Sequence, residues 1–146
     1  MSLHYMLMKT HSTLVRKISY RAQKELGLSS GQPKVLDCLM DHEGSDQKTI
    51  ASICEIEQAT LGSILLRMEE KGFIERKQMD GNRRSLFVYL TDTGKELACK
   101  MKKIFEEEDA KALRSFSQTE IANLQKTLDI LCKNMNQNME ADNDGK

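Results

Sequence analysis

The chain has 146 residues, a length that suits one domain or two small lobes that share a core. Its hydrophobic content of 39% and charged content of 30% are typical of a water-soluble globular protein. Basic and acidic residues balance at 22 each, so the net charge excludes no partner and any nucleic-acid signal must be local. The N-terminal segment lacks the apolar core of a signal peptide, and no apolar run approaches the ~20 residues of a membrane span. We therefore expect a cytoplasmic protein with no membrane partner.

The first third of the chain predicts two helices. From about Leu7 to Leu26, apolar residues at helical spacing form one stripe. The segment GLSSGQP then breaks the chain, and Ser29 or Ser30 can cap a second helix. That helix tolerates Pro33 only in its first turn and ends at DHEGSD.

The middle of the chain predicts two more helices and a β-hairpin. QKTIASICE is typical of a short helix, and a longer one follows over positions 58 to 71. The buried face of the longer helix is predicted from apolar residues spaced three and four apart: Leu61, Ile64, Leu65 and Met68. Gly72 stands where a left-handed C-terminal cap is needed. FIERK and SLFVYL then predict two strands, joined by the glycine-containing turn QMDGNRR.

The last third is predicted to be helical again. Thr91 can cap one helix, and SQTE forms a capping box with Ser117 at the N-cap and Glu120 three residues later. A heptad seam follows in the last helix: Ile121, Leu124, Leu128, Leu131 and Met135. A small monomer could bury this seam internally, but together with the N-terminal helix the seam predicts a homodimer interface. NQNMEADNDGK predicts a frayed polar tail.

Helix, turn, helix and hairpin follow one another as in a winged helix-turn-helix. The outer side of the helix over positions 58 to 71 presents hydrogen-bonding groups and one cation: Gln58, Thr60, Ser63 and Arg67. Such side chains can bond to base edges and phosphates in a DNA major groove. An ordinary amphipathic helix with a solvated outer face remains the alternative.

The predicted hairpin carries a local excess of positive charge. Four basic residues face a single acid, Asp80, between positions 76 and 84: Arg76, Lys77, Arg83 and Arg84. A basic hairpin can contact phosphates or enter a narrow minor groove, and we predict such contacts for Arg83 and Arg84. Lys48, at the start of the short helix, could add a phosphate contact. The alternative is a charged edge that protects the sheet from aggregation.

These segments resemble the MarR family of bacterial transcription regulators. The similar motifs are Ala59-Thr60-Leu61, RMEEKGFIER, the DGNRR wing and LTDTGKEL. The resemblance implies a mainly α-helical fold with a small β-hairpin, a winged helix-turn-helix plus a helical dimerisation region. The implied divisions are an N-terminal dimerisation helix over 1–28, the DNA-binding domain over 29–92, C-terminal dimerisation helices over 93–138 and a disordered tail over 139–146.

The resemblance also implies a function. It describes a homodimer that binds a pseudo-palindromic operator in double-stranded DNA, usually as a repressor, with Arg84 matching the family's wing arginine. A small phenolic or other aromatic effector, or oxidation, often releases the DNA. The effector would lie between the dimerisation helices and the winged domain, where His11, Arg16 and Met40 are candidates. Each also has an ordinary interpretation: His11 as a surface or interface residue, Arg16 as a solvated charge and Met40 as a core residue.

Three positions depart from the family pattern. Gly62 stands where family members commonly have Thr or Ser, and Ser63 stands where they often have Arg. Asn82 stands where the wing usually has Asp. Gly62 either lets backbone and DNA approach closely or marks drift at a tolerant position. The operator sequence therefore stays open.

The four cysteines, Cys38, Cys54, Cys99 and Cys132, form no CxxC pair and have no histidine at zinc-ligand spacing. We interpret them as reduced and partly buried, and we expect no metal and no cofactor. The first helix lacks the reactive cysteine of peroxide-sensing members. A redox-responsive regulator and a winged-helix module that binds protein remain alternatives. An enzyme is disfavoured, because the chain shows neither a phosphate-binding loop nor a nucleophile–base pair.

Overall fold

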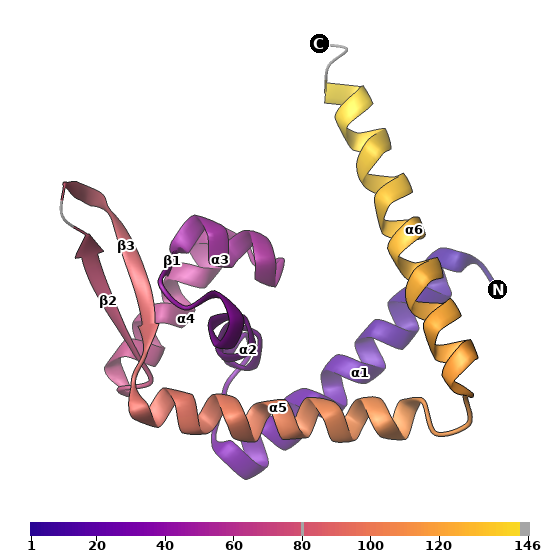
Figure 1. Ribbon diagram of the computed structural model, residues 1–146, viewed down its shortest axis with the longest axis horizontal. Helices are drawn as coiled ribbons and strands as arrows, with labels where there is room; N and C mark the ends of the chain where they lie inside the picture. The colour runs from indigo at the N-terminus through magenta and orange to yellow at the C-terminus, as the bar shows by residue number, and fades with distance from the viewer. Residues whose placement is uncertain (80, 144–146) are drawn as a thin grey trace. The chain divides into compact units, whose positions relative to one another are not determined.

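The computed structural model describes residues 1–79 and 81–143, and the side chains of residues 79, 82–84 and 138–143 are outside the description. The elements follow the order α1 (Leu3–Leu26), α2 (Gln32–His42), β1 (Ser45–Asp46), α3 (Gln47–Cys54), α4 (Gln58–Glu70), β2 (Ile74–Met79), β3 (Asn82–Leu90), α5 (Asp92–Ala112) and α6 (Gln118–Asn143) (Figure 1). The mainly α-helical class with a small β-sheet is confirmed. Two compact units divide the chain, Met1–Glu108 and Asp109–Lys146.

The ends of α1 and α2 differ from the sequence prediction. The first helix starts at Leu3, because the Ser2 hydroxyl accepts a hydrogen bond of 3.2 Å from the Tyr5 amide and caps it. The second helix takes Gly31 as its N-cap, with no side-chain capping bond, so the predicted serine caps are wrong. Gly31 has φ +83°, a left-handed conformation that favours glycine, and a Cβ there would also displace the end of the Ile64 side chain. Pro33 lies in the first turn, as predicted.

The sheet has three antiparallel strands in the order β1–β3–β2. The predicted hairpin is confirmed, with Ile74 opposite Leu90 and Gln78 opposite Leu86. The first strand pairs Ser45 with Val88. Sequence reasoning missed this strand, since two residues are too few to show an alternating pattern. Figure 1 shows the β2–β3 hairpin at one edge of its unit.

One hydrophobic core holds the first unit together. The predicted face of α4, Leu61, Ile64, Leu65 and Met68, is buried in it. Further buried side chains come from α2, α3, the sheet and α5: Val35, Leu36, Leu39, Ile50, Ile74, Val88, Ala98, Met101 and Ile104. The outer face of α4 is consequently left free of the core.

The end of α4, the start of β2 and the start of α5 meet at one junction. Gly72 is left-handed, with φ +76°, and its amide donates to the Glu69 carbonyl at 3.0 Å, while the Phe73 amide donates to the Met68 carbonyl at 2.9 Å. These two bonds form the predicted C-terminal cap. The predicted cap of α5 is also confirmed, because the Thr91 hydroxyl accepts from the Gly94 amide at 3.0 Å.

Thr91 and Gly94 complete this junction. The Thr91 hydroxyl donates to the Gly72 carbonyl at 2.6 Å, and the Thr91 amide donates to the Phe73 carbonyl at 3.1 Å. A Cβ at Gly94 would collide with that same Phe73 carbonyl oxygen. The glycine of the LTDTGKEL motif is therefore required by packing, which the sequence pattern alone did not reveal.

An ion-pair cluster links α1 to α5 within the first unit. Arg21 contacts Glu25 at 2.8 Å, Glu107 at 2.8 Å and Glu108 at 3.1 Å. Only 5% of the Glu108 side chain is exposed, so this carboxylate needs a cationic partner. Hydrogen bonds first to Glu25 and then to Glu107 raise the pKa of the Arg21 guanidinium above its ordinary value.

The second unit contains the capping box predicted at the start of α6. The Ser117 amide donates to the Glu120 carboxylate at 2.7 Å, and the Glu120 amide donates to the Ser117 hydroxyl at 3.2 Å. The helix continues to Asn143, beyond the predicted end at position 138, because no glycine or proline interrupts it before that point. Residues 144–146 of the predicted tail lie outside the described residues.

In the described part of the chain no single helix is long and apolar enough to cross a membrane. Helices α3 and α4 together have the length and composition of a span, but they are bent by 108° relative to one another.

Candidate nucleic-acid interface

The α3 and α4 helices form the helix-turn-helix of the first unit. Their axes are bent by 108° at the connection, within the range typical of this motif. Asp46 caps α3 by accepting a hydrogen bond of 2.8 Å from the Thr49 amide. Hydrogen bonding to Thr49 lowers the pKa of the Asp46 carboxyl. Glu55 ends α3 in a left-handed conformation, with φ +53°. The turn is thus built from local interactions that fix the direction of α4.

The predicted DNA-contacting residues of the helices lie on the surface. Lys48 is exposed in the first turn of α3. The other four are exposed along α4: Gln58, Thr60, Ser63 and Arg67. Arg83 and Arg84 lie on β3 at the tip of the hairpin, but their side chains are outside the described part of the structure.

The outermost line of α4 is one that sequence reasoning missed. Opposite the buried face, helical spacing aligns Ala59, Ser63, Leu66 and Glu70, and all four are exposed. Of the Leu66 residue, 48% is exposed. Gln58, Thr60 and Arg67 lie to the two sides of this line. Their spacing of four, three and four residues is the sequence signal for this line, but only one of the four, Ser63, is among the polar residues predicted to contact DNA.

Gly62 has no packing role within the fold. A Cβ at this helical position would meet only the Gln47 amide nitrogen, at 3.8 Å, which is an ordinary contact. The fold would therefore accept alanine here, in contrast to Gly31 and Gly94.

The base of the wing is less basic than the sequence suggested. Arg76 donates two hydrogen bonds to the Glu69 carboxylate of α4, at 3.2 and 3.0 Å, and a third to the side-chain amide oxygen Oε1 of Gln47 at 3.4 Å. Lys77 lies 3.5 Å from Glu75, with its ammonium 5.1 Å from the centre of the Tyr89 ring. The predicted excess of three positive charges did not include Glu75, which precedes Arg76 on β2, or Glu69, which reaches Arg76 from α4.

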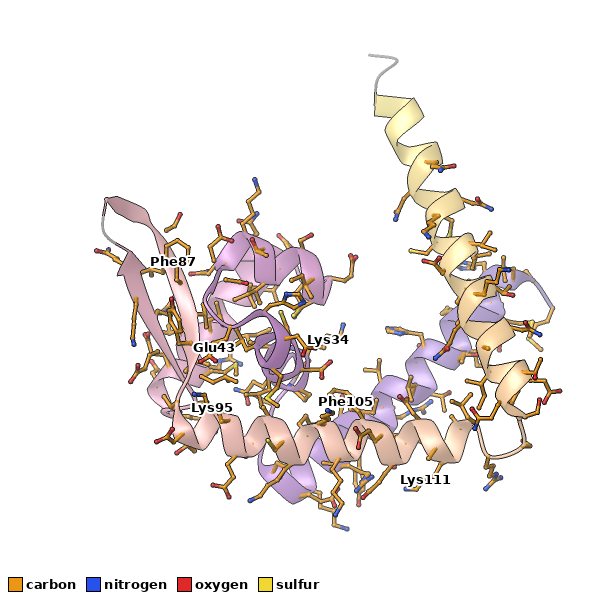
Figure 2. All side chains as sticks on the ribbon, in the orientation of Figure 1. Lys34, Glu43, Phe87, Lys95, Phe105 and Lys111 are labelled. Atoms are coloured by element: carbon orange, nitrogen blue, oxygen red, sulfur yellow. The ribbon has the colours of Figure 1, made fainter. Side chains whose placement is uncertain are left out.

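A cavity of about 240 Å³ lies between α1, the start of α2, α4 and α5 in the first unit. Its apolar walls are Val15, Ile18, Pro33, Ile56, Ile64 and Phe105, and its polar groups are Ser19, Ser30, Lys34 and Thr60. Figure 2 shows Lys34 on α2 and Phe105 on α5. Thr60 thus belongs both to the cavity and to the exposed side of α4. The candidate effector residues His11, Arg16 and Met40 are exposed and are not among the cavity's lining residues.

The cysteines divide into a buried pair and an exposed pair. Cys38 and Cys54 are buried where α2 meets α3, and the Cys54 thiol donates to the Lys34 carbonyl at 3.5 Å. Burial raises the pKa of the Cys54 thiol to about 12 and also raises that of Cys38. Burial thus disfavours the reactive thiolate form of both cysteines. Cys99 and Cys132 are exposed free thiols.

Comparisons with known proteins agree with this architecture. The model of the MarR family matches residues 28–86. The uncharacterized HTH-type transcriptional regulator YwoH of Bacillus subtilis (strain 168) is 36% identical over 99 residues, which cover 64% of this chain and 72% of YwoH. A Listeria monocytogenes protein crystallised in complex with 26mer DNA has a TM-score of 0.88 at 23% identity, covering 94% of this chain and 91% of that one. The Staphylococcus aureus MepR–DNA complex has a TM-score of 0.85 at 20% identity, covering 92% and 99%.

The element order, the exposed outer face of α4 and the β2–β3 wing define a winged helix-turn-helix transcriptional regulator of the DNA-binding class, not an enzyme. The matched relative is itself a regulator of this class. The chain belongs to the MarR family, as its motifs predicted.

Proposed function

We propose that this regulator acts as a homodimer that binds a pseudo-palindromic operator in double-stranded DNA and represses transcription from it. The observation that carries the proposal is the outer face of α4, which the core leaves free and which holds Gln58, Thr60, Ser63 and Arg67. Two copies of α4 would enter successive major grooves about 34 Å apart, and Lys48, Arg83 and Arg84 would contact phosphates or the minor groove. Two neighbours in fold that were crystallised with DNA support this reading.

The homodimer is supported by apolar side chains exposed in the single chain. On α1 they are Leu3, Tyr5, Met6, Met8, Val15 and Tyr20, and on α6 they are Leu124, Leu128, Ile130 and Met135. Exposed apolar side chains that gather along a helix are typical of surfaces that associate with another protein, rather than of surfaces that stay in contact with water. Light scattering at micromolar concentration tests this part, and a monomer would contradict it.

A small aromatic effector is supported by the cavity of the first unit. Its mainly apolar wall suits a ring, and Lys34 supplies a cation for a phenolate or carboxylate group. Because Thr60 of α4 lines the cavity, an effector that fills the cavity would contact the helix that is proposed to bind DNA. His11, Arg16 and Met40 would then act from outside this wall.

Operator binding is tested by measuring the affinity for duplex DNA across a range of salt concentrations. A regulator that neutralises phosphates releases counterions, so its affinity should fall steeply as salt rises. Affinity for duplexes that does not change with salt would instead favour a winged-helix module that binds protein. A promoter–reporter assay then separates repression from activation, and adding salicylate as a probe tests release by a phenolic acid.

A further inference from the structure

The outermost line of α4 is poor in the groups that usually read bases. Ala59, Ser63 and Leu66 occupy it over the first three turns, and all are exposed. One hydroxyl and two apolar side chains are the only groups that this line offers before Glu70. The polar candidates Gln58 and Arg67 lie on its flanks.

Two small residues leave Leu66 as the largest group on this surface. Gly62 and Ser63 lie between Ala59 and Leu66 and project little or nothing beyond the helix backbone. Leu66 is not needed by the core, which is filled by other α4 residues, and 48% of it is exposed. An isolated exposed leucine has little meaning. On a helix whose outer face contacts DNA, however, it determines what can lie against that face.

The base edges in a major groove offer one apolar group, the C5-methyl of thymine. Leucine and alanine side chains cannot hydrogen bond, and their burial against a polar base edge would leave that edge without a partner. Against a thymine methyl, the same side chains gain by removing apolar surface from water.

We propose that Leu66, with Ala59, reads thymine methyl groups in the operator, so that Leu66 is a specificity-determining residue. This inference rests on the operator binding proposed above. A protein partner would bury Leu66 equally well, but the adjacent Arg67 and the DNA-bound neighbours in fold favour a nucleic acid.

The experiment uses duplexes that the full-length protein enriches from a random-sequence library. Each thymine of the enriched half-site is replaced in turn by deoxyuridine, which removes only the methyl group. We expect affinity to fall about fourfold per contacted methyl, equivalent to about 0.8 kcal/mol. Leu66→Ala should bind the thymine and uracil duplexes equally at the position that it contacts, with an unchanged salt dependence because no charge is lost.

Ile53→Ala is the matched control, since Ile53 is 44% exposed and lies on the neighbouring α3. This variant should keep the wild-type preference for thymine. Leu66→Asn, which can pair with adenine, provides a second variant whose enriched sequences should shift from thymine toward adenine. Circular dichroism confirms that each variant is folded.

Two results would overturn the inference while leaving operator binding intact. One is equal wild-type affinity for thymine and uracil duplexes, and the other is an unchanged thymine preference in both Leu66 variants. Enrichment of no duplex at all would instead overturn operator binding, and the inference with it.

Discussion

Arg76 and Glu69 join the wing to the last turn of α4 through two parallel hydrogen bonds. The bonds run from Nε to Oε2 at 3.2 Å and from Nη2 to Oε1 at 3.0 Å, with the Arg76 side chain only 16% exposed. A bidentate pair fixes the direction of both partners. The orientation of β2 relative to α4 is therefore set by side chains as well as by the backbone.

Glu69→Gln should weaken this link. Hydrogen bonding to Arg76 lowers the pKa of the Glu69 carboxyl, and neutralising it leaves a mostly buried guanidinium without its counter-charge. Since 38% of the Glu69 side chain is exposed, we expect a loss of only about 1 kcal/mol in unfolding free energy, measured by urea denaturation. Glu75→Gln, which disturbs only the exposed pair with Lys77, is the control and should change stability by a few tenths of a kcal/mol at most. Equal effects would show that the Arg76 pair has no special role.

Gly62→Ala should stabilise the protein. The position is helical and the nearest atom to a new Cβ is 3.8 Å away, so the helix gains about 0.5–1 kcal/mol. Urea denaturation measures the gain. Unchanged operator affinity in the same variant would indicate drift, whereas weaker binding would support close approach of backbone and DNA.

Gly94→Ala should have the opposite effect on stability, although this glycine also lies in a helix. Its Cβ would collide with the Phe73 carbonyl oxygen, and overpacking of this kind costs about 1–3 kcal/mol. The same denaturation experiment checks it. A neutral result would mean that the junction can open without loss.

Asp46→Asn should reduce the pH dependence of stability. The folded-state pKa of Asp46 is lowered by its bond to Thr49, so its contribution is present above the unfolded pKa of about 3.9 and is lost as pH falls through the folded value. Asparagine also caps helices but does not titrate in this range, so the variant should fall slightly below the wild type at pH 7, and this difference should shrink toward pH 3. Thermal melts at both pH values measure the difference. An identical pH dependence of stability in the two proteins would show that Asp46 does not contribute to the loss of stability at acid pH.

Arg84→Ala should weaken binding to many duplexes alike and reduce the salt slope by about one. The reason is that a wing arginine neutralises phosphate or enters the minor groove without reading bases. Arg114→Ala removes the same charge from the turn before α6, a segment that is not part of the winged helix-turn-helix, and should leave the slope unchanged. Fluorescence anisotropy across salt concentrations checks both. An unchanged salt dependence of affinity in Arg84→Ala would contradict the proposed contact between Arg84 of the wing and DNA.

The sequence predicted those features of the fold that depend on periodic spacing or on hydrogen bonds between residues close together in the chain. The buried face of α4, the Gly72 cap and the Ser117–Glu120 capping box each depend on residues within a few positions of one another, so spacing alone revealed them. The packing of Gly94 on Phe73 depends on residues that are distant along the chain, and no local pattern encodes it.

The candidate site was predictable in its location but less so in its chemistry. Charge counting along the chain overstated the wing, because Glu69 neutralises Arg76 from another element. The cavity is lined from four separate segments, and the three effector candidates chosen from single helices do not line it. Leu66 was not among the predicted DNA contacts, because polar side chains are the usual readers of base edges, although its spacing places it on the outermost line of α4.

The contact of Gly94 with the Phe73 carbonyl has a mechanical consequence. The last turn of α4, the root of the wing and the first turn of α5 meet at this point with no side chain between backbones, and Thr91 bonds across it. A rotation of α4 would therefore displace the start of β2 and the first turn of α5 together with it.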